Sequence, residues 1–553
     1  MGYVDVSGVS YQLPDGRTLF SDVSFRVGEG AKVALIGANG TGKTTLVRMI
    51  AGDIPVPQGA IVRSGGLGIM RQMVGMRDAE NPLNSLAISL APPKLRRLGA
   101  RLDEATRHLE KAEARGKFAN EARKAQVAYA DVLTEWGDAG GYEFEVQCDT
   151  VSVGVLKEPW DTARHRPLAT LSGGEQKRFA LELLLHGPEE VLLLDEPDNF
   201  LDVPAKRELE ARINESAKTI LFVSHDREVL ANTAQRIVTL EAQDVWIHGG
   251  GFAGWHDARV ARHERFEERR RRWDEEHRKL KELVSMYRQK ASYNSDMASR
   301  LRAAETRLDR FVKIGPPPIP PRPQNVSMQL KGGRTGKRAV VCEQLELEDL
   351  TFPFDLEIWY GDRVAILGGN GTGKSHFLRL LAQLGDGAVS GARDSVPVRH
   401  DGIARLGARV VPGHFSQTHD RADLHGRSLR QILWEGGKNR DSLERSHAMN
   451  VLNRYELAQQ SEQNFETLSG GQQARFLVLL LELSGATCLL LDEPTDNLDL
   501  DSAQALERGL AAFEGTVLAV THDRWFTRGF DRFVVFSEDG EVVERDEPSW
   551  EGT

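Results

Sequence analysis

The chain has 553 residues, of which 40% are hydrophobic and 27% charged, and its formal net charge is -10. This length allows about two to four domains, and the composition is that of an ordinary globular protein. No apolar run approaches the roughly 20 residues of a membrane-spanning helix, and the amino terminus lacks the basic and apolar segments of a secretory signal. We therefore expect a cytoplasmic protein without membrane insertion.

The cysteines and the acidic charge exclude further classes of protein. Cys148, Cys342 and Cys488 are too far apart for the Cys-x-x-Cys spacing of zinc or iron–sulfur sites, and their odd number does not suit a disulfide framework. We expect all three to be reduced and structural. The net negative charge argues against nucleic-acid binding over the whole surface, so any such contact must be local.

The first motif along the chain is a phosphate-binding loop, which follows an apolar strand and opens a helix. Its glycines allow backbone N–H groups to point at phosphates, Lys43 adds positive charge, and Thr44 offers a hydroxyl to Mg²⁺. The motif therefore predicts binding of a nucleoside triphosphate with Mg²⁺. The predicted contacts are Gly37, Ala38, Asn39, Gly40, Thr41, Gly42, Lys43, Thr44 and Thr45.

A helical segment follows this loop. Between 95 and 136, apolar residues are spread among Arg, Lys, Glu and Ala, and no proline occurs from 94 to 158. This pattern favours helix. We predict a helical arm at about 80–160, with a decorative insertion as the alternative.

The next buried strand carries the predicted catalytic carboxylates. The apolar run 191–194 ends in Asp195, which is expected to hold the magnesium shell. Glu196 beside it is placed to orient or deprotonate the attacking water. A structural ion pair is the alternative, which the Gly-Lys loop upstream disfavours.

The segment 256–313 is free of proline and densely charged, with 17 Arg or Lys and 10 Asp or Glu between 258 and 313. Its apolar residues recur in steps of seven and then of four and three, which is typical of two helices that share a seam. They are Phe266, Trp273, Leu280 and Tyr287, then Met297, Leu301, Ala304, Leu308 and Phe311. We predict a basic antiparallel hairpin that turns at 291–296, with a first helix of about 33 residues and some 50 Å.

The exit from this hairpin is rich in proline and then in glycine. Prolines between 316 and 323 predict a stiff, extended segment. Gly332, Gly333 and Gly336 are then expected to loosen the chain before the next domain.

Four motifs then return in the same order, which indicates a duplicated domain. From Ser172 to Asp195 and from Ser469 to Asp492 are both 23 positions. The repeat predicts two α/β domains, 1–255 and 336–553, joined by the linker 256–335. The repeated strings are Gly-Gly-Asn-Gly-Thr-Gly-Lys-Ser from Gly368, Leu-Ser-Gly-Gly-Gln-Gln from Leu468, Leu-Leu-Leu-Asp-Glu-Pro from Leu489 and Val-Thr-His-Asp-Arg from Val520.

The two copies differ in length between two of their motifs. From Gln72 to Leu171 are 99 positions, but from Gln417 to Leu468 only 51. The first copy thus carries the arm as an addition to the shared core.

The order of these motifs resembles the ATP-binding cassette superfamily over nearly the whole chain. The resemblance implies a head-to-tail sandwich, in which the Ser-Gly-Gly loop of one cassette closes on the γ-phosphate held by the other. One implied site takes from the first cassette the loop 37–45, Gln72, Asp195, Glu196 and His225, and from the second Ser469, Gly470, Gly471 and Gln472.

The other implied site has the same composition with the cassettes exchanged. Both sites keep the catalytic Glu and His, so both are expected to hydrolyse ATP, with Thr44, Gln72 and Asp195 or Ser375, Gln417 and Asp492 at the metal. The second site comprises Gly368, Gly369, Asn370, Gly371, Thr372, Gly373, Lys374, Ser375, His376, Gln417, Asp492, Glu493 and His522, with Ser172, Gly173, Gly174 and Glu175.

The two copies differ at the base of the nucleotide. Tyr11, 26 positions before the phosphate loop, matches the family's adenine-stacking aromatic, with a core tyrosine as the alternative. The same spacing in the second copy leads to Cys342, and the aromatics Phe352 and Phe354 lie too close to the loop. Adenine stacking there stays open, and His376 stands where a small Thr is usual.

Two cassettes, an arm and a charged hairpin resemble the ABC-F group of cytoplasmic ATPases that act on the ribosome. The resemblance implies a monomer whose hairpin 256–313 enters the tRNA exit site and touches the tRNA in the peptidyl site, while the arm contacts the large subunit near its stalk. The motor of an ABC transporter with a separate membrane subunit is the alternative, although such a motor needs no basic hairpin. DNA-repair members and iron–sulfur recycling factors of the superfamily need clustered cysteines, and the three cysteines of this chain form no such cluster.

Within this group, general translation control and protection against antibiotics both stay open. The strings Asp-Glu-Pro-Asp-Asn-Phe-Leu-Asp from Asp195 and Asp-Glu-Pro-Thr-Asp-Asn-Leu-Asp from Asp492 depart from the usual Asp-Glu-Pro-Thr-Asn-His-Leu-Asp. The second is similar to that of resistance members. The short tip of the hairpin at 291–296 argues against a role in antibiotic resistance.

Overall fold

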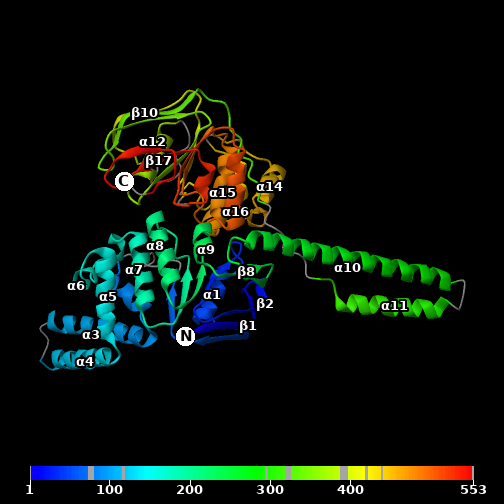
Figure 1. Ribbon diagram of the computed structural model, residues 1–553, viewed down its shortest axis with the longest axis horizontal. Coiled ribbons are helices and arrows are strands. Elements are labelled where there is room, and N and C mark those ends of the chain that lie inside the picture. Colours follow the sequence, from blue (N-terminus) through cyan, green and yellow to red (C-terminus); the bar gives the residue numbers. More distant parts are fainter. Residues whose placement is uncertain are drawn as a thin grey trace. The chain divides into compact units, whose positions relative to one another are not determined.

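The computed structural model describes residues 2–71, 80–114, 119–292, 297–317, 326–385, 396–416, 421, 423–437 and 440–550. These residues form two compact units (Figure 1). One comprises Met1–Ile247 with Gln324–Thr553 and contains both cassettes, and the other comprises His248–Pro323. The predicted boundaries at 255 and 335 stay predictions.

The first cassette combines a larger, mostly parallel sheet with a small antiparallel one. The larger sheet has the strand order β5-β6-β7-β3-β8-β9 and the smaller one β2-β1-β4. Strands β3, β6 and β7 are buried along their whole length and rich in Val, Ile and Leu, as a parallel sheet covered on both faces requires. The strands are β1 (Tyr3–Gln12), β2 (Thr18–Val27), β3 (Lys32–Ile36), β4 (Gln58–Ser64), β5 (Leu67–Met70), β6 (Val191–Asp195), β7 (Thr219–Val223), β8 (Arg236–Glu241) and β9 (Asp244–His248).

Helix α1 (Lys43–Ala51) packs between these two sheets. Its residues Leu46, Val47 and Ile50 share one apolar cluster with the buried side chains of both sheets. Because α1 starts at the phosphate-loop lysine, this packing fixes the loop at the carboxyl end of β3. The other helices are α2 (Leu83–Leu90), α3 (Pro93–Ala114), α4 (Ala119–Asp138), α5 (Gly141–Leu156), α6 (Trp160–Ala163), α7 (Gly173–His186), α8 (Val203–Glu215) and α9 (Arg227–Thr233), with a short 3-10 turn η1 (Leu168–Thr170).

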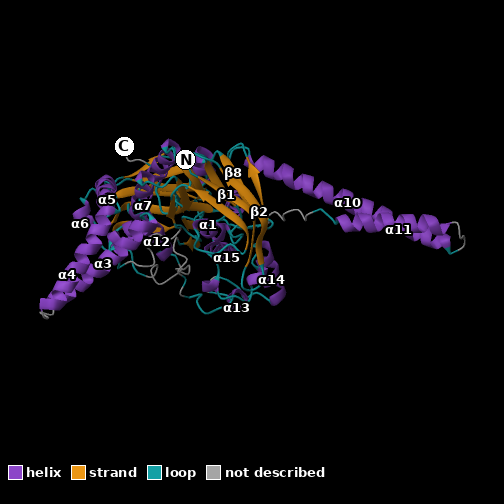
Figure 2. Cartoon of the chain, turned by 90° about the horizontal axis from the view of Figure 1, so that it is seen from below, coloured by secondary structure: helices purple, strands orange, loops and turns teal. Residues whose placement is uncertain are grey.

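Helices α3 and α4 form the arm and lie side by side, extending away from the sheets (Figures 1 and 2). An ion pair between Arg101 Nη1 and Glu135 Oε2, 2.6 Å apart, joins the two helices. They cover the range 95–136 for which the sequence predicts helix, except 115–118, which lie outside the described residues.

The second cassette repeats the plan without the arm. Its sheets have the orders β14-β15-β16-β12-β17-β18 and β11-β10-β13, and α12 packs between them. The strands are β10 (Arg338–Leu347), β11 (Phe354–Trp359), β12 (Arg363–Gly368), β13 (His400–Leu406), β14 (Pro412–Phe415), β15 (Cys488–Asp492), β16 (Thr516–Val520), β17 (Arg532–Phe536) and β18 (Val542–Arg545). The helices are α12 (Lys374–Gln383), α13 (Leu429–Glu435), α14 (Arg445–Arg454), α15 (Gly470–Leu483) and α16 (Leu500–Ala511), with 3-10 turns η2 (Ala458–Gln460), η3 (Phe465–Thr467) and η4 (Phe526–Gly529).

The segment before β10 packs onto the second cassette. Val326, Met328 and Leu330 are buried in its core cluster. A Cβ at Gly332 would lie 1.9 Å from the Glu514 carbonyl oxygen, so this glycine permits close packing of two backbone segments. The expectation that Gly332 loosens the chain is therefore wrong.

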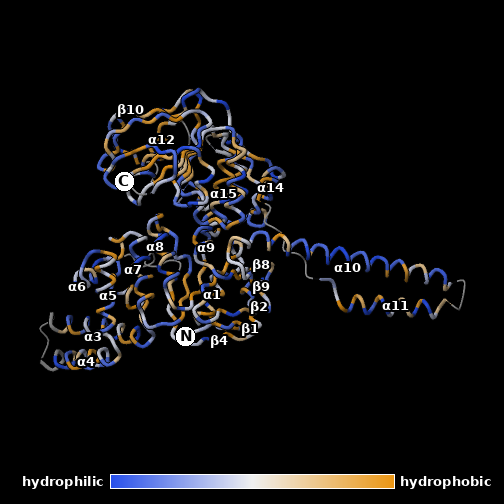
Figure 3. Tube along the Cα trace, viewed as in Figure 1, coloured by the Kyte–Doolittle hydropathy of each residue, from blue (hydrophilic) through white to orange (hydrophobic). Residues whose placement is uncertain are grey.

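The second unit consists of two antiparallel helices. Helix α10 (Trp255–Ala291) has 37 residues and α11 (Met297–Ile314) has 18; at 1.5 Å per residue, α10 is about 55 Å long. The ring of Trp273 stacks on Phe311 with centroids 5.2 Å apart, and Leu280, Val284 and Ala304 are buried. Most residues of α10 are hydrophilic (Figure 3). The turn 293–296 lies outside the described residues.

We expect Leu280→Ala to loosen this hairpin without affecting the cassettes. Leu280 is 4% exposed, and removing a buried leucine side chain costs about 2–5 kcal/mol. Faster amide exchange across α10 and α11, with an unchanged thermal transition of the cassettes, would be the outcome. The control is Met286→Ala, since Met286 is 38% exposed; equal effects of both substitutions would contradict the seam.

Candidate active sites

Each phosphate loop ends at the start of a helix, where backbone N–H groups are available to an anion. Gly42 and Gly373 immediately precede α1 and α12 with φ values of 102° and 97°, which favour glycine. The Nζ of Lys43 donates to the carbonyl oxygens of Gly37 and Ala38 at 2.8 and 3.1 Å. Lys374 bonds Gly368 in the same way at 2.9 Å. Burial lowers the pKa of both lysines.

The aspartates at the ends of β6 and β15 face these loops. Ser375 Oγ donates to Asp492 Oδ1 at 3.0 Å, and the Thr44 hydroxyl bonds Asp195. Asp195 Oδ1 is buried and has no hydrogen-bond partner among the described residues. A buried carboxylate oxygen beside a hydroxyl fits Mg²⁺, which prefers such ligands. The predicted ligands Gln72 and Gln417 lie outside the described residues.

The two predicted catalytic glutamates follow these aspartates in sharp turns, with φ of 53° at Glu196 and 47° at Glu493. Their side chains have different partners. Glu196 Oε2 accepts from Asn199 Nδ2 at 2.6 Å. Glu493 Oε2 instead accepts the backbone N–H of His522 at 3.0 Å, and Asp496 occupies the place of Asn199.

The predicted catalytic histidines are buried beside positive charge. Burial and the nearby Lys43 lower the pKa of His225 to about 3. Burial, with Lys374 and Lys206, lowers the pKa of His522 as well. Both imidazoles are therefore neutral at pH 7 and able to accept a hydrogen bond. Burial raises the pKa of Glu493, and Asp496 and Asp492 add to this effect.

The Ser-Gly-Gly loops form the first turns of α7 and α15. Ser172 and Ser469 are the N-cap residues, and each forms a capping box, with Glu175 and Gln472 respectively. A Cβ at Gly471 would lie 2.1 Å from Asn39 Nδ2 of the first phosphate loop. The serine loop of the second cassette thus lies directly against the phosphate loop of the first.

Contacts run from each phosphate loop to the opposite cassette. The backbone N–H of Asn39 donates to Asp499 Oδ2 at 2.9 Å, and its side-chain amide to the Asn497 carbonyl oxygen at 2.9 Å. In the other direction, Asn370 Nδ2 donates to the Phe200 carbonyl oxygen at 3.2 Å. The cassettes are therefore arranged head to tail.

About half of the predicted site residues line one cavity of about 670 Å³ between the cassettes. Tyr11, Asp195, Asp492 and the second phosphate loop other than Asn370 are not in its lining. The predicted residues that line it are Asn39, Gly40, Gly42, Lys43, Thr44, Thr45, Ser172, Gly173, Gly174, Glu196, His225, Asn370, Ser469, Gly470, Gly471, Glu493 and His522.

Strand register places a leucine in the second cassette where the first has Tyr11. Tyr11 pairs with Phe20, and their rings lie 6.2 Å apart. The register of β10 against β11 aligns Cys342 with Val6 of β1, so Leu347 is the counterpart of Tyr11. Counting positions misplaced Cys342 because the β10–β11 connection is shorter.

The other unusual residues of the second site differ in their surroundings. Phe354 packs edge-on against Phe377 and Phe536 in the core, whereas Phe352 is 62% exposed. His376 lies on α12, and burial followed by Arg379 lowers its pKa.

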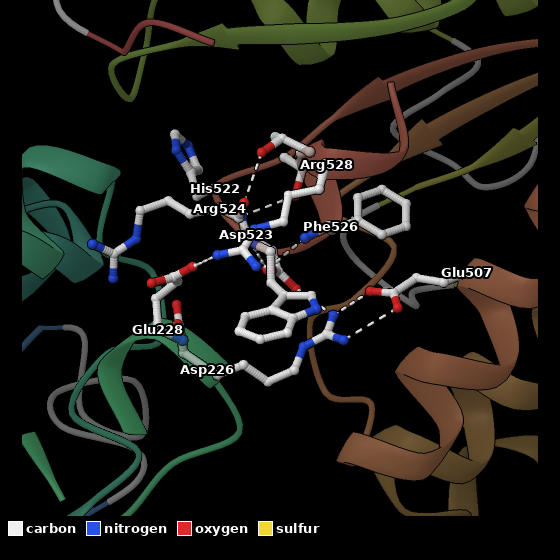
Figure 4. Close-up of polar contacts among 12 residues, drawn as sticks. Asp226, Glu228, Glu507, His522, Asp523, Arg524, Phe526 and Arg528 are labelled. Atoms are coloured by element: carbon white, nitrogen blue, oxygen red, sulfur yellow. Dashed lines mark hydrogen bonds and ion pairs between the residues drawn. The ribbon is translucent and has the colours of Figure 1, made fainter. Parts of the chain in front are cut away.

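Two reciprocal ion pairs cross the cassette interface and were not anticipated from the sequence. Arg227 pairs with Glu507 (Figure 4), and Arg524 pairs with Glu210. Each arginine directly follows a His-Asp motif, and each glutamate lies on the helix after the opposite Glu-Pro motif. The four charges occupy equivalent positions in the two copies. This equivalence is the sequence signal that could have predicted the ion pairs. A further pair, Arg528 with Glu228, has no counterpart, because Trp525 and Ala231 occupy those positions.

The first cassette also contains buried charges near Glu196 that sequence reasoning missed. Lys177 Nζ donates to the Glu196 carbonyl oxygen at 2.6 Å, and burial lowers the pKa of this lysine to about 8. Burial and the charge of Asp226 raise the pKa of Asp198 to about 6. Asp198 is the residue that departs from the family's usual Thr, and the positive charges of Lys206 and Lys177 act on it.

We expect the Arg524–Glu210 pair to show strong coupling. Both side chains are nearly buried, at 11% and 10% exposure, and removing one partner of a buried pair costs about 3–5 kcal/mol. In a double-mutant cycle of thermal unfolding, R524A and E210A should therefore be far from additive, with a coupling of about 0.5–3 kcal/mol. The exposed pair Arg405–Glu343 is the control, for which about 0–1 kcal/mol is expected; equal coupling would contradict a buried cross-cassette bond.

Comparison with known proteins places this geometry in a family. Residues 20–199 and 352–496 match the ABC transporter family. The chain is 56% identical to an antibiotic resistance protein of Mycobacteroides abscessus over 100% of both chains. It is 25% identical to the energy-dependent translational throttle protein EttA of Haemophilus influenzae, over 96% of this chain and 91% of that protein.

The fold also matches a solved twin-cassette structure. The archaeal ribosome recycling factor aABCE1, in complex with the ribosomal stalk protein aP1, superposes with a TM-score of 0.55 over 97% of this chain and 89% of that chain, at 18% identity. Within the described residues, every helix is too short or too polar to cross a membrane. The predicted α/β fold with tandem ATP-binding cassettes is confirmed. The chain belongs to the ATP-binding cassette family and to its ABC-F group.

Proposed function

We propose that this ABC-F protein hydrolyses ATP at two composite sites and uses the resulting closure and opening to act on the ribosome. The reciprocal contacts of Asn39 and Asn370 with the opposite cassette carry the first part of the proposal. They bring each phosphate loop against the other cassette. Binding of the γ-phosphate in a loop is therefore linked to closure of the two cassettes.

The residues divide the chemistry between them. The phosphate loop with Lys43 or Lys374 binds the phosphates, and the Ser-Gly-Gly loop of the opposite cassette presents the N–H groups of its helix to the γ-phosphate. Glu196 or Glu493 accepts a proton from the attacking water or orients it, and the neutral His225 or His522 donates its ring N–H to a γ-phosphate oxygen. Mg²⁺, held by Asp195 with Thr44 or by Asp492 with Ser375, would neutralise developing phosphate charge.

The basic hairpin supports the ribosome as the partner. Its helices carry exposed arginines on a chain of net charge -10, and a local positive surface suits RNA phosphate. The Mycobacteroides abscessus relative is named an antibiotic resistance protein, and EttA is named a translational throttle. These names support ribosome protection or translation control in the cytoplasm. We propose that the chain acts as a monomer, since both sites form within one chain.

We expect E196Q with E493Q to bind ATP, to lose turnover, and to remain on the ribosome. The carboxamide keeps the shape of each side chain but cannot accept the proton of water, so the closed state accumulates. Phosphate release and cosedimentation with ribosomes measure the two effects. Turnover near that of the wild type would remove Glu196 and Glu493 from the mechanism.

If turnover is lost but the ATP-saturated double variant sediments free of ribosomes, the motor of a membrane transporter becomes the better interpretation. A pull-down from membranes would then be needed.

We expect R300E, R302E and R310E together to weaken ribosome binding and flatten its salt dependence. These arginines are exposed on α11, whereas Arg307 pairs with Glu276 at 3.5 Å and is left unchanged. Removal of one phosphate contact lowers the log-log salt slope by about one unit. ATPase activity without ribosomes should not change.

The control has the same change in net charge on the cassettes. Arg236, Arg445 and Arg508 are exposed there, and their replacement by Glu should leave the slope nearly unchanged. Equal slopes for the hairpin variant and the wild type would exclude this surface as an RNA contact.

A further inference from the structure

One half of the cassette interface contains a buried lysine that the other half lacks. Lys206 on α8 is 8% exposed. At the offset that relates Glu196 to Glu493, its counterpart is Ala503. A buried ammonium group is stable only with hydrogen-bond acceptors and an opposite charge, so the partners of Lys206 show what it holds in place.

Lys206 has one partner in each cassette. Its Nζ donates to Asp226 Oδ2 at 2.9 Å and to the His522 carbonyl oxygen at 3.1 Å. Asp226 is itself fixed, because its other carboxylate oxygen accepts the backbone N–H groups of Glu228 and Val229 at the start of α9. The ammonium group is therefore anchored in the first cassette and reaches into the second.

The contact continues from His522 to the second glutamate. The backbone N–H of His522 donates to Glu493 Oε2 at 3.0 Å, and His522 Nε2 lies 3.5 Å from Glu493 Oε1. Only one residue thus separates the lysine of the first cassette from the predicted catalytic carboxylate of the second.

The first site is arranged differently. Ala503 has no donor with which to hold His225 from across the interface, and Glu196 is held within its own cassette by the Asn199 amide. Asp496, the counterpart of Asn199, has no side-chain N–H to offer Glu493. The second glutamate therefore depends on the His522 backbone where the first depends on an amide side chain.

We propose that Lys206 is a positioning residue for the second ATP site: from the first cassette it holds His522 and, through His522, the orientation of Glu493. The proposal rests on the proposed hydrolysis at both sites. Because the contact requires both cassettes to be together, it makes hydrolysis at the second site depend on closure.

The test is Lys206→Met in the full-length protein, with hydrolysis restricted to one site at a time. In the E196Q background, where the second site turns over, kcat should fall about tenfold or more with KM for ATP nearly unchanged, since misplacement of a catalytic group lowers kcat. In the E493Q background the change should stay below about twofold. K206R keeps the charge and the donors and should restore most of the activity. Equal losses in both backgrounds, or no rescue by K206R, would overturn the proposal.

Lys32→Met is the matched control for loss of a buried lysine. Lys32 is 3% exposed and donates to the Gly30 and Ser216 carbonyl oxygens within the first cassette. Its loss should lower thermal stability without a site-selective fall in kcat. If Lys32→Met reproduced the selective loss, Lys206 would have a structural role alone.

A second measurement does not require turnover. In the ATP-bound E196Q/E493Q protein, Lys206→Met should raise amide exchange at 521–524, and Lys32→Met should not. Unchanged exchange there would also overturn the proposal. Retained turnover of E196Q/E493Q would instead contradict the proposed hydrolysis, and the exchange measurement would still decide the role of Lys206.

Discussion

The contact between the two cassettes is the constraint on which the rest of the structure depends. In the proposed function neither ATP site is complete within one cassette, because each phosphate loop contacts the opposite cassette. Much of the contact is ionic, with Arg227, Arg524, Glu210 and Glu507 buried or half-buried across it. Charged side chains recover their hydration when an interface opens, whereas exposed apolar surface does not. Such a contact suits cassettes that must separate after each cycle.

The local parts of the sites followed from the sequence because short-range geometry determines them. A phosphate loop needs glycines with positive φ and a lysine at the helix start, and these requirements lie within eight residues. A buried strand that ends in Asp-Glu likewise delivers its carboxylates to the sheet edge. The positions of such residues depend on neighbours in the chain, so a linear pattern was sufficient to predict them.

Features that depend on register or on the opposite cassette were less accessible. Cys342 was aligned with Tyr11 by counting, but the shorter connection after β10 moves Leu347 into that place. Gly332 was interpreted as flexible, although its role is a close approach to the Glu514 backbone. Lys206 gave no signal, because a single lysine on an amphipathic helix is normally a solvated side chain and its burial depends on a partner about 300 positions away.

Fusion of the cassettes into one chain explains why such a lysine is possible. In a symmetric homodimer, a buried lysine close to the two-fold axis would occur twice, and the two ammonium groups would repel each other unless each had its own acceptors. In a fused chain each interface position exists once in each copy, so Lys206 corresponds to Ala503, and Lys177 corresponds to Ala474. The charge of Lys206 is balanced by Asp226 and that of Lys177 by Asp198. Duplication within one polypeptide therefore allows the two ATP sites to be held by different residues, and it allows one of them to depend on the other cassette.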